Sequence, residues 1–72
     1  RQMCIREETL RVYLEQHLSA TQAARELFIH RSTFLYRLDR IKEILQSELD
    51  DPEEIFYLEL SFRLLEQEQE KE

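Results

Sequence analysis

Glycine is absent from all 72 residues of this chain, and proline occurs only once, at Pro52. Glycine supplies the positive φ angles of tight hairpin turns without steric cost, so a chain that lacks it is poorly suited to β-hairpins. The remaining composition is dominated by leucine, glutamate, arginine and glutamine, which are good helix formers. The sequence therefore predicts an all-α fold.

Length and apolar content allow one small hydrophobic core. With 72 residues, 42% of them apolar, we expect a single domain over residues 1–72. Cys4 is the only cysteine, which excludes an intrachain disulfide and makes the cytoplasm the default location. No apolar run approaches the roughly 20 residues of a membrane span, so we expect no membrane contact. The chain begins at Arg1 rather than Met, which suggests a fragment of a longer polypeptide.

The apolar spacing predicts a small bundle of about four helices. Thr21 is the predicted N-cap of the second helix, and Ile29 and His30 form the break before the third. Asp51 as a cap, followed by Pro52 at the first helical position, is a strong start signal for the fourth helix. The predicted helices span about 6–17, 21–28, 31–46 and 52–67.

The first and third predicted helices each present one apolar stripe to the core. In the first helix the stripe comprises Met3, Leu10, Tyr13, Leu14 and His17 or Leu18, with Ile5 and Val12 on the other side. In the third helix the stripe comprises Phe34, Leu38, Ile41 and Leu45. The opposite face of the third helix is polar, so it is free to meet a partner.

The predicted fourth helix is apolar on two sides. Its first stripe comprises Ile55, Leu58, Phe62 and Leu65, and its second comprises Tyr57, Leu60 and Leu64. A domain this small cannot easily bury both stripes. We therefore expect the second stripe to be an interface, covered by another subunit or by the missing part of the chain.

The net charge of −6 is unevenly distributed along the chain. Residues 25–42 carry five basic groups against two acidic ones, whereas residues 43–72 carry two basic groups against eleven acidic ones. The whole-chain charge therefore averages over two surfaces of opposite sign. The central basic segment remains a candidate surface for an anionic partner.

A short helix, a tight break and a longer helix with a polar outer face form a helix-turn-helix, whose second helix enters the DNA major groove. Phosphates and base edges are read by hydroxyls and planar donors at the start and flanks of that helix. We expect Arg31 and Arg37 to contact phosphates, whereas His30 either contacts DNA or only caps the helix. The predicted DNA-binding residues are His30, Arg31, Ser32, Thr33, Tyr36, Arg37 and Arg40.

Two segments, "AARELFIHRSTFLYRLDRI" and "LDDPEEIFYLELSFRLL", together resemble the C-terminal helix-turn-helix domain of PucR/CdaR-type bacterial transcriptional regulators. The resemblance covers about residues 9–65. It implies double-stranded DNA as a partner, a homodimer or higher oligomer, and an N-terminal sensor domain in the same chain. The "HRxT" and "YRL" segments of the family's recognition helix correspond to residues 30–33 and 36–38. Ser32 stands where the family often has Asn, and Phe34-Leu35 where it often has Leu-Arg.

Catalytic and metal-binding patterns are missing from the sequence. Cys4 and two distant histidines lack any zinc-ligand spacing, and no carboxylate pair accompanies a candidate nucleophile. We expect no enzyme, no metal site and no cofactor. The competing interpretation is a helical dimerisation or protein-docking module, which the net charge and the two-sided fourth helix favour. The abrupt break and the hydroxyl-rich helix start favour DNA binding.

Overall fold

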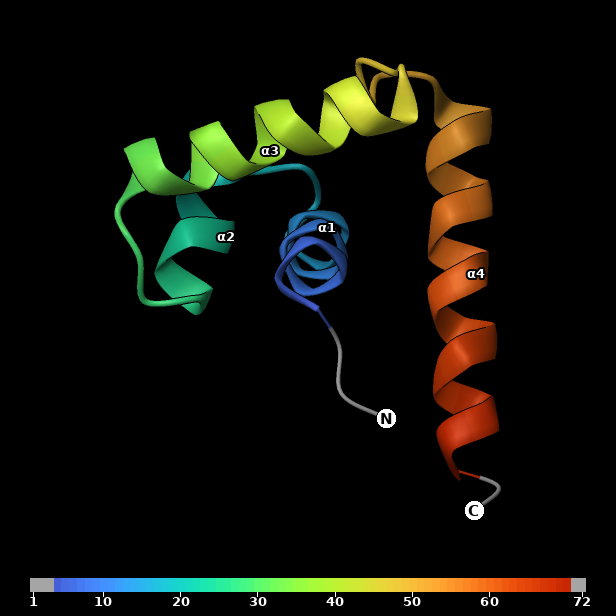
Figure 1. The fold of residues 1–72 in the computed structure, drawn as a ribbon. Coiled ribbons are helices and arrows are strands. Elements are labelled where there is room, and N and C mark those ends of the chain that lie inside the picture. The colour runs from blue at the N-terminus through green and yellow to red at the C-terminus, as the bar shows by residue number, and fades with distance from the viewer. Residues whose placement is uncertain (1–3, 71–72) are drawn as a thin grey trace.

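Four α-helices follow one another through residues 4–70, the part of the chain that the computed structural model describes (Figure 1). They are α1 (Ile5–Glu15), α2 (Ala20–Glu26), α3 (Arg31–Leu45) and α4 (Pro52–Glu70). Within residues 4–70 there is no β-strand, so the prediction of an all-α fold is confirmed. Met3, which the sequence assigns to the first apolar stripe, lies outside the described residues.

The core is built around α1, which contacts each of the other three helices (Figure 1). α3 packs across α1 and α2, while α4 packs against α1 alone. Ala23 and Ala24 are small enough for α2 to approach its neighbours closely. The buried core side chains are Leu10, Val12, Leu14, Ala23, Ala24, Phe34, Leu38, Ile41 and Leu49.

The N-cap of α2 is Ser19, so the prediction of Thr21 is wrong. The Ser19 hydroxyl accepts a hydrogen bond from the backbone N–H of Gln22 at 3.2 Å. The hydroxyl of Thr21 instead accepts one from Nε of Arg31, at 3.1 Å. The predicted cap of α4 is confirmed, because Asp51 Oδ1 accepts a hydrogen bond from the N–H of Glu53 at 3.1 Å.

The corrected cap gives a matched pair of variants. We expect Ser19→Ala to lower the free energy of unfolding by about 1 kcal/mol, because an orphan N–H of α2 loses its acceptor. Thr21→Ala should change it by less than about 0.5 kcal/mol, because Thr21 is exposed and lies inside the first turn. Urea denaturation of the two variants measures the difference. Equal losses would contradict the assignment of Ser19 as the cap.

The helices end at residues in the left-handed region, even though none of them is glycine. His17 and Leu18 have φ angles of 56° and 65°, so α1 ends at Glu15 and not at residue 17. Phe28, at 58°, lies in the turn at residues 27–30, which is longer than the predicted break. Gln46, at 52°, ends α3. Each such residue ends a helix at a steric cost that glycine would avoid.

Other boundaries and burial predictions also need correction. α4 continues to Glu70, beyond the predicted end at 67. Val12 is only 3% exposed, because α1 is surrounded by three helices and buries more than one side. Leu45 is 39% exposed, because the last turn of α3 extends past α1 (Figure 1). Leu49, which the sequence left unassigned, is buried in the connection between α3 and α4.

Candidate nucleic-acid interface

The predicted DNA-binding residues lie on the outer face and the two flanks of α3 and at its N-terminus. Phe34, Leu38 and Ile41 are buried beneath the helix, and this orientation turns the opposite side outward. The side chain of Tyr36 is 63% exposed, and Arg37 is half-buried on the flank. The exposed predicted residues are His30, Arg31, Ser32, Thr33, Tyr36 and Arg40.

Arg31 is held by a residue of the preceding helix. Its Nε donates a hydrogen bond to the hydroxyl of Thr21 at 3.1 Å, which links the first turns of α2 and α3. Thr21 was not among the predicted contact residues, because its hydroxyl looked like a helix cap. Its only sequence signal is its place at the start of the short helix before the turn.

Arg40 is held in a similar way by a residue of its own helix. Its guanidinium donates a hydrogen bond to the phenol oxygen of Tyr36 at 3.3 Å, one turn earlier along α3. A neutral hydroxyl orients a guanidinium without neutralising its charge. Both arginines therefore keep their full positive charge at the surface.

Among residues 4–68, whose side chains the structure describes, no carboxylate forms an ion pair with Arg31, Arg37 or Arg40. On α1, in contrast, Arg11 pairs with Glu15 at 2.8 Å. The chain holds 16 acidic residues, so carboxylates are not scarce. Unpaired cations along one helix create a local positive potential that attracts anions despite a negative net charge.

The first turn of α3 is open to a ligand. His30 occupies the N-cap position, but its side chain makes no capping hydrogen bond. The hydroxyls of Ser32 and Thr33 make no hydrogen bond to any described residue. The free backbone N–H groups and the helix dipole of such a turn favour a negatively charged group.

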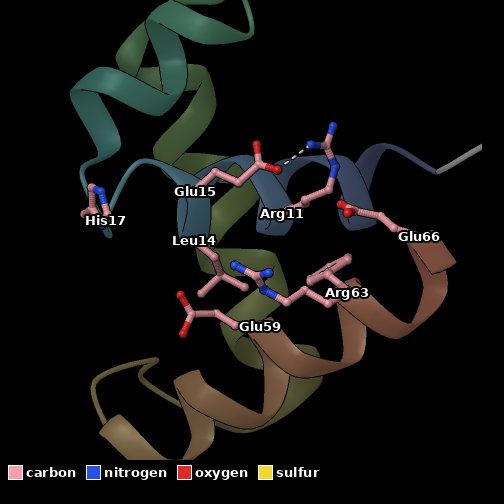
Figure 2. Close-up of a pocket in the computed structure, with 8 residues that line it drawn as sticks. Arg11, Leu14, Glu15, His17, Glu59, Arg63 and Glu66 are labelled. Carbon is pink, nitrogen blue, oxygen red and sulfur yellow. Dashed lines mark hydrogen bonds and ion pairs between the residues drawn. The ribbon is translucent and has the colours of Figure 1, made fainter.

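A second surface, the groove between α1 and α4, has a different character (Figure 2). This open groove of about 390 Å³ is lined by three carboxylates, of Glu15, Glu59 and Glu66. Arg11 and Arg63 also line it, and Arg11 is already paired with Glu15. The balance of charge makes this groove unsuitable for a phosphate backbone.

The described part of the chain shows neither a metal-binding cluster nor a membrane-spanning helix. There, no three side chains of His, Cys, Asp or Glu gather closely enough to hold a metal ion. None of the helices in residues 4–70 combines the length and the apolar character needed to cross a membrane.

Comparisons with known proteins add independent information. The family model of the PucR C-terminal helix-turn-helix domain matches residues 7–64. The purine catabolism regulatory protein of Bacillus subtilis (strain 168) is 43% identical over 56 residues. That alignment covers 78% of this chain and 10% of the relative, so the chain spans about a tenth of the relative's length. No solved structure matches the chain.

Proposed function

Because the chain belongs to the family of PucR C-terminal helix-turn-helix domains, the DNA-binding output domains of transcription regulators, we propose that it reads specific duplex DNA with α3 in the major groove. One observation carries this proposal. α3 carries three arginines that have no carboxylate partner among the described side chains of an otherwise acidic chain.

The dimensions of α3 suit the major groove. An α-helix with its side chains is about 10 to 12 Å wide, close to the width of the groove in B-DNA. Arg31 and Arg40 are nine residues apart, which corresponds to about 13 Å along the axis and half a turn around it. The two side chains therefore leave the helix on opposite sides. Each lies nearer a different phosphate backbone when α3 enters the groove.

The side chains divide into two roles. Arg31, Arg37 and Arg40 contact phosphates, which supply affinity and fix the register of the domain on the duplex. The N-terminal residues of α3 contact base edges, as in other helix-turn-helix proteins. Thr21 is a positioning residue, because its hydroxyl orients the guanidinium of Arg31. The predicted base-facing residues are His30, Ser32, Thr33 and Tyr36.

Fluorescence-anisotropy titration across a salt series tests the phosphate contacts. We expect Arg37→Ala to weaken binding to all sequences alike and to reduce the slope of log K against log salt by about one. Arg25→Ala is the matched control, because Arg25 is exposed at the end of α2 and should leave the slope unchanged. An unchanged slope for Arg37→Ala would remove that residue from the interface.

A second candidate function is protein docking by a helical module. The exposed side chains of Tyr57, Leu60 and Leu64 on α4 favour it, because nothing in the described chain covers them. Retention on nonspecific duplex at low salt separates the two candidates. DNA binding predicts retention that the Arg31/Arg37/Arg40→Ala variant loses, whereas a pure docking module would not be retained at all.

The biological setting follows from the family. The relative is named as a regulator of purine catabolism, and about nine tenths of its length lies outside the match. By analogy, this domain is the output end of a longer bacterial regulator whose N-terminal part senses a signal. It would act in the cytoplasm, where bacterial DNA is located, without chemistry of its own.

A further inference from the structure

The outer side of α4 has the residue spacing of a coiled-coil seam. Tyr57, Leu60, Leu64 and Gln67 are separated by three, four and three residues, which is the spacing of alternating a and d positions in a heptad. These four residues form the α4 seam. The three apolar members are 66%, 41% and 56% exposed, in that order. The seam therefore presents apolar surface that the described chain leaves uncovered.

The opposite side of α4 already has its partner. Ile55, Leu58 and Phe62 are partly buried against the core. The hydroxyl of Ser47 also donates a hydrogen bond to the carboxylate of Glu54, which ties the start of α4 to the preceding loop. The position of α4 in the domain is thus fixed without the seam. A partner on the seam would not disturb the core.

We propose that the α4 seam pairs with the same seam of a second copy of this chain, forming a parallel two-stranded coiled coil. The pairing itself does not depend on DNA binding. Only its link to paired half-sites rests on the proposed function, which it deepens. The exposure of its three apolar side chains identifies the surface, because the core-facing stripe of α4 has the same residue spacing but is partly buried. The spacing itself is the one that a two-stranded coiled coil requires.

The charges beside the seam identify the occupant and its direction. With Tyr57 and Leu64 at a positions, Arg63 falls at g and Glu68 at e. In a parallel pair, g faces the e position of the next heptad in the other helix, so Arg63 meets Glu68 of the second copy on both sides. An antiparallel pair sets g against g and e against e, which brings like charges together. Both residues are exposed.

Arg63 is available for this contact. Its side chain extends beside the α1–α4 groove, near Glu59, yet it forms no ion pair with a described residue (Figure 2). Exposed arginine side chains change rotamer at little cost, so the guanidinium can turn toward a neighbouring helix. The single basic residue of α4 is therefore not committed within the domain.

The parallel direction also suits DNA. α3 lies crosswise at one end of the domain, and α4 extends away from that end on the same side as the core (Figure 1). A two-fold axis along α4 leaves both copies of α3 at one end, with outer faces turned the same way and N-termini pointing apart. Inverted half-sites separated by one helical turn, or a whole number of turns, require this symmetry. An antiparallel pair would place the two α3 helices at opposite ends.

Sedimentation equilibrium of the 72-residue chain from about 10 µM to 1 mM tests the pairing. A seam of two heptads is a small interface, so we expect a dissociation constant on the order of 100 µM. The Leu60→Asp/Leu64→Asp variant should raise it more than about tenfold, since carboxylates at a and d are desolvated in the dimer. Phe28→Asp is the control. Phe28 is 94% exposed in the turn between α2 and α3, outside the α4 seam, so the dimer of this variant should persist.

A charge exchange tests the parallel register separately from apolar contact. Arg63→Glu and Glu68→Arg should each weaken the homodimer about tenfold, because each turns two attractive pairs into repulsive ones. A mixture of the two variants should form a heterodimer that is tighter than either homodimer, because both pairs become attractive again. Circular dichroism is the control, and it should show that each variant keeps its helices.

Three results would overturn the proposal. The first is that the chain stays monomeric at 1 mM. The second is that the two leucine substitutions leave the dissociation constant of the dimer unchanged. The third is that the heterodimer in the mixture has a dissociation constant no lower than those of the two homodimers. A chain that stays monomeric would assign the seam to another part of a longer regulator.

DNA titration of the Leu60→Asp/Leu64→Asp variant separates this proposal from the proposed function. This variant should bind a single half-site with an unchanged salt slope per protomer, but it should lose cooperative binding to paired half-sites. If the wild-type chain forms the dimer but does not bind DNA, the proposed DNA binding is contradicted and the proposed pairing is not.

Discussion

The Arg31/Arg37/Arg40→Ala variant is expected to lose about 500-fold in DNA affinity at 0.1 M salt, and its salt slope should fall by nearly three. Each phosphate contact contributes about 0.9 to the slope of log K against log salt, so each is worth about eightfold at 0.1 M relative to 1 M. Three such contacts multiply to the expected loss. Anisotropy titrations at several salt concentrations measure both quantities.

The fold should survive this triple substitution. The three side chains form no ion pair with the described residues. Arg31 and Arg40 donate hydrogen bonds only to the hydroxyls of Thr21 and Tyr36, respectively. Far-UV circular dichroism and the melting temperature should therefore stay close to those of the wild type. The Arg6/Arg11/Arg25→Ala variant removes the same charge from other surfaces. If it loses as much slope, binding is a diffuse attraction and α3 is not the interface.

The core face of α3 was predictable from sequence, whereas the burial of α1 was not. Phe34, Leu38 and Ile41 recur at helical spacing, and a helix packed on one side buries one stripe. α1 violates that assumption, because three helices surround it and Val12 is buried together with Leu10. A pattern along one helix does not show how many neighbours it has. That number is fixed only by the tertiary arrangement.

The outer face of α3 was predictable for the same reason as its core face, because a helix that buries one side must expose the other. The partners of the arginines were not predictable. The bond between Arg31 and Thr21 joins residues ten positions apart, and it depends on how α2 crosses α3. Serine and threonine are both favourable N-cap residues, so Ser19 and Thr21 are alternatives in the sequence. The bond from the Gln22 N–H to Ser19 and the bond from Arg31 to Thr21 distinguish their roles.

Phe34→Ala is expected to cause the largest loss of stability, about 3 to 5 kcal/mol. The Phe34 side chain is fully buried, and its ring centroid lies 5.8 Å from that of Tyr13 on α1. Removing the ring deletes its packing against Tyr13 of α1 and leaves a cavity. At about 0.05 to 0.15 kcal/mol per residue, a 72-residue domain has roughly 4 to 11 kcal/mol of total stability. Urea denaturation should therefore show a chain that is close to unfolding in water.

Phe28→Ala makes the same chemical change at a side chain that is 94% exposed. It should alter the free energy of unfolding by less than about 1 kcal/mol, because no packing is lost. The comparison of the two variants bears on function as well as on stability. Burial of Phe34 is what turns Ser32, Tyr36 and Arg40 outward on the same helix. If Phe34→Ala were as stable as Phe28→Ala, the orientation of α3 would be wrong, and the proposed DNA-binding face would be wrong with it.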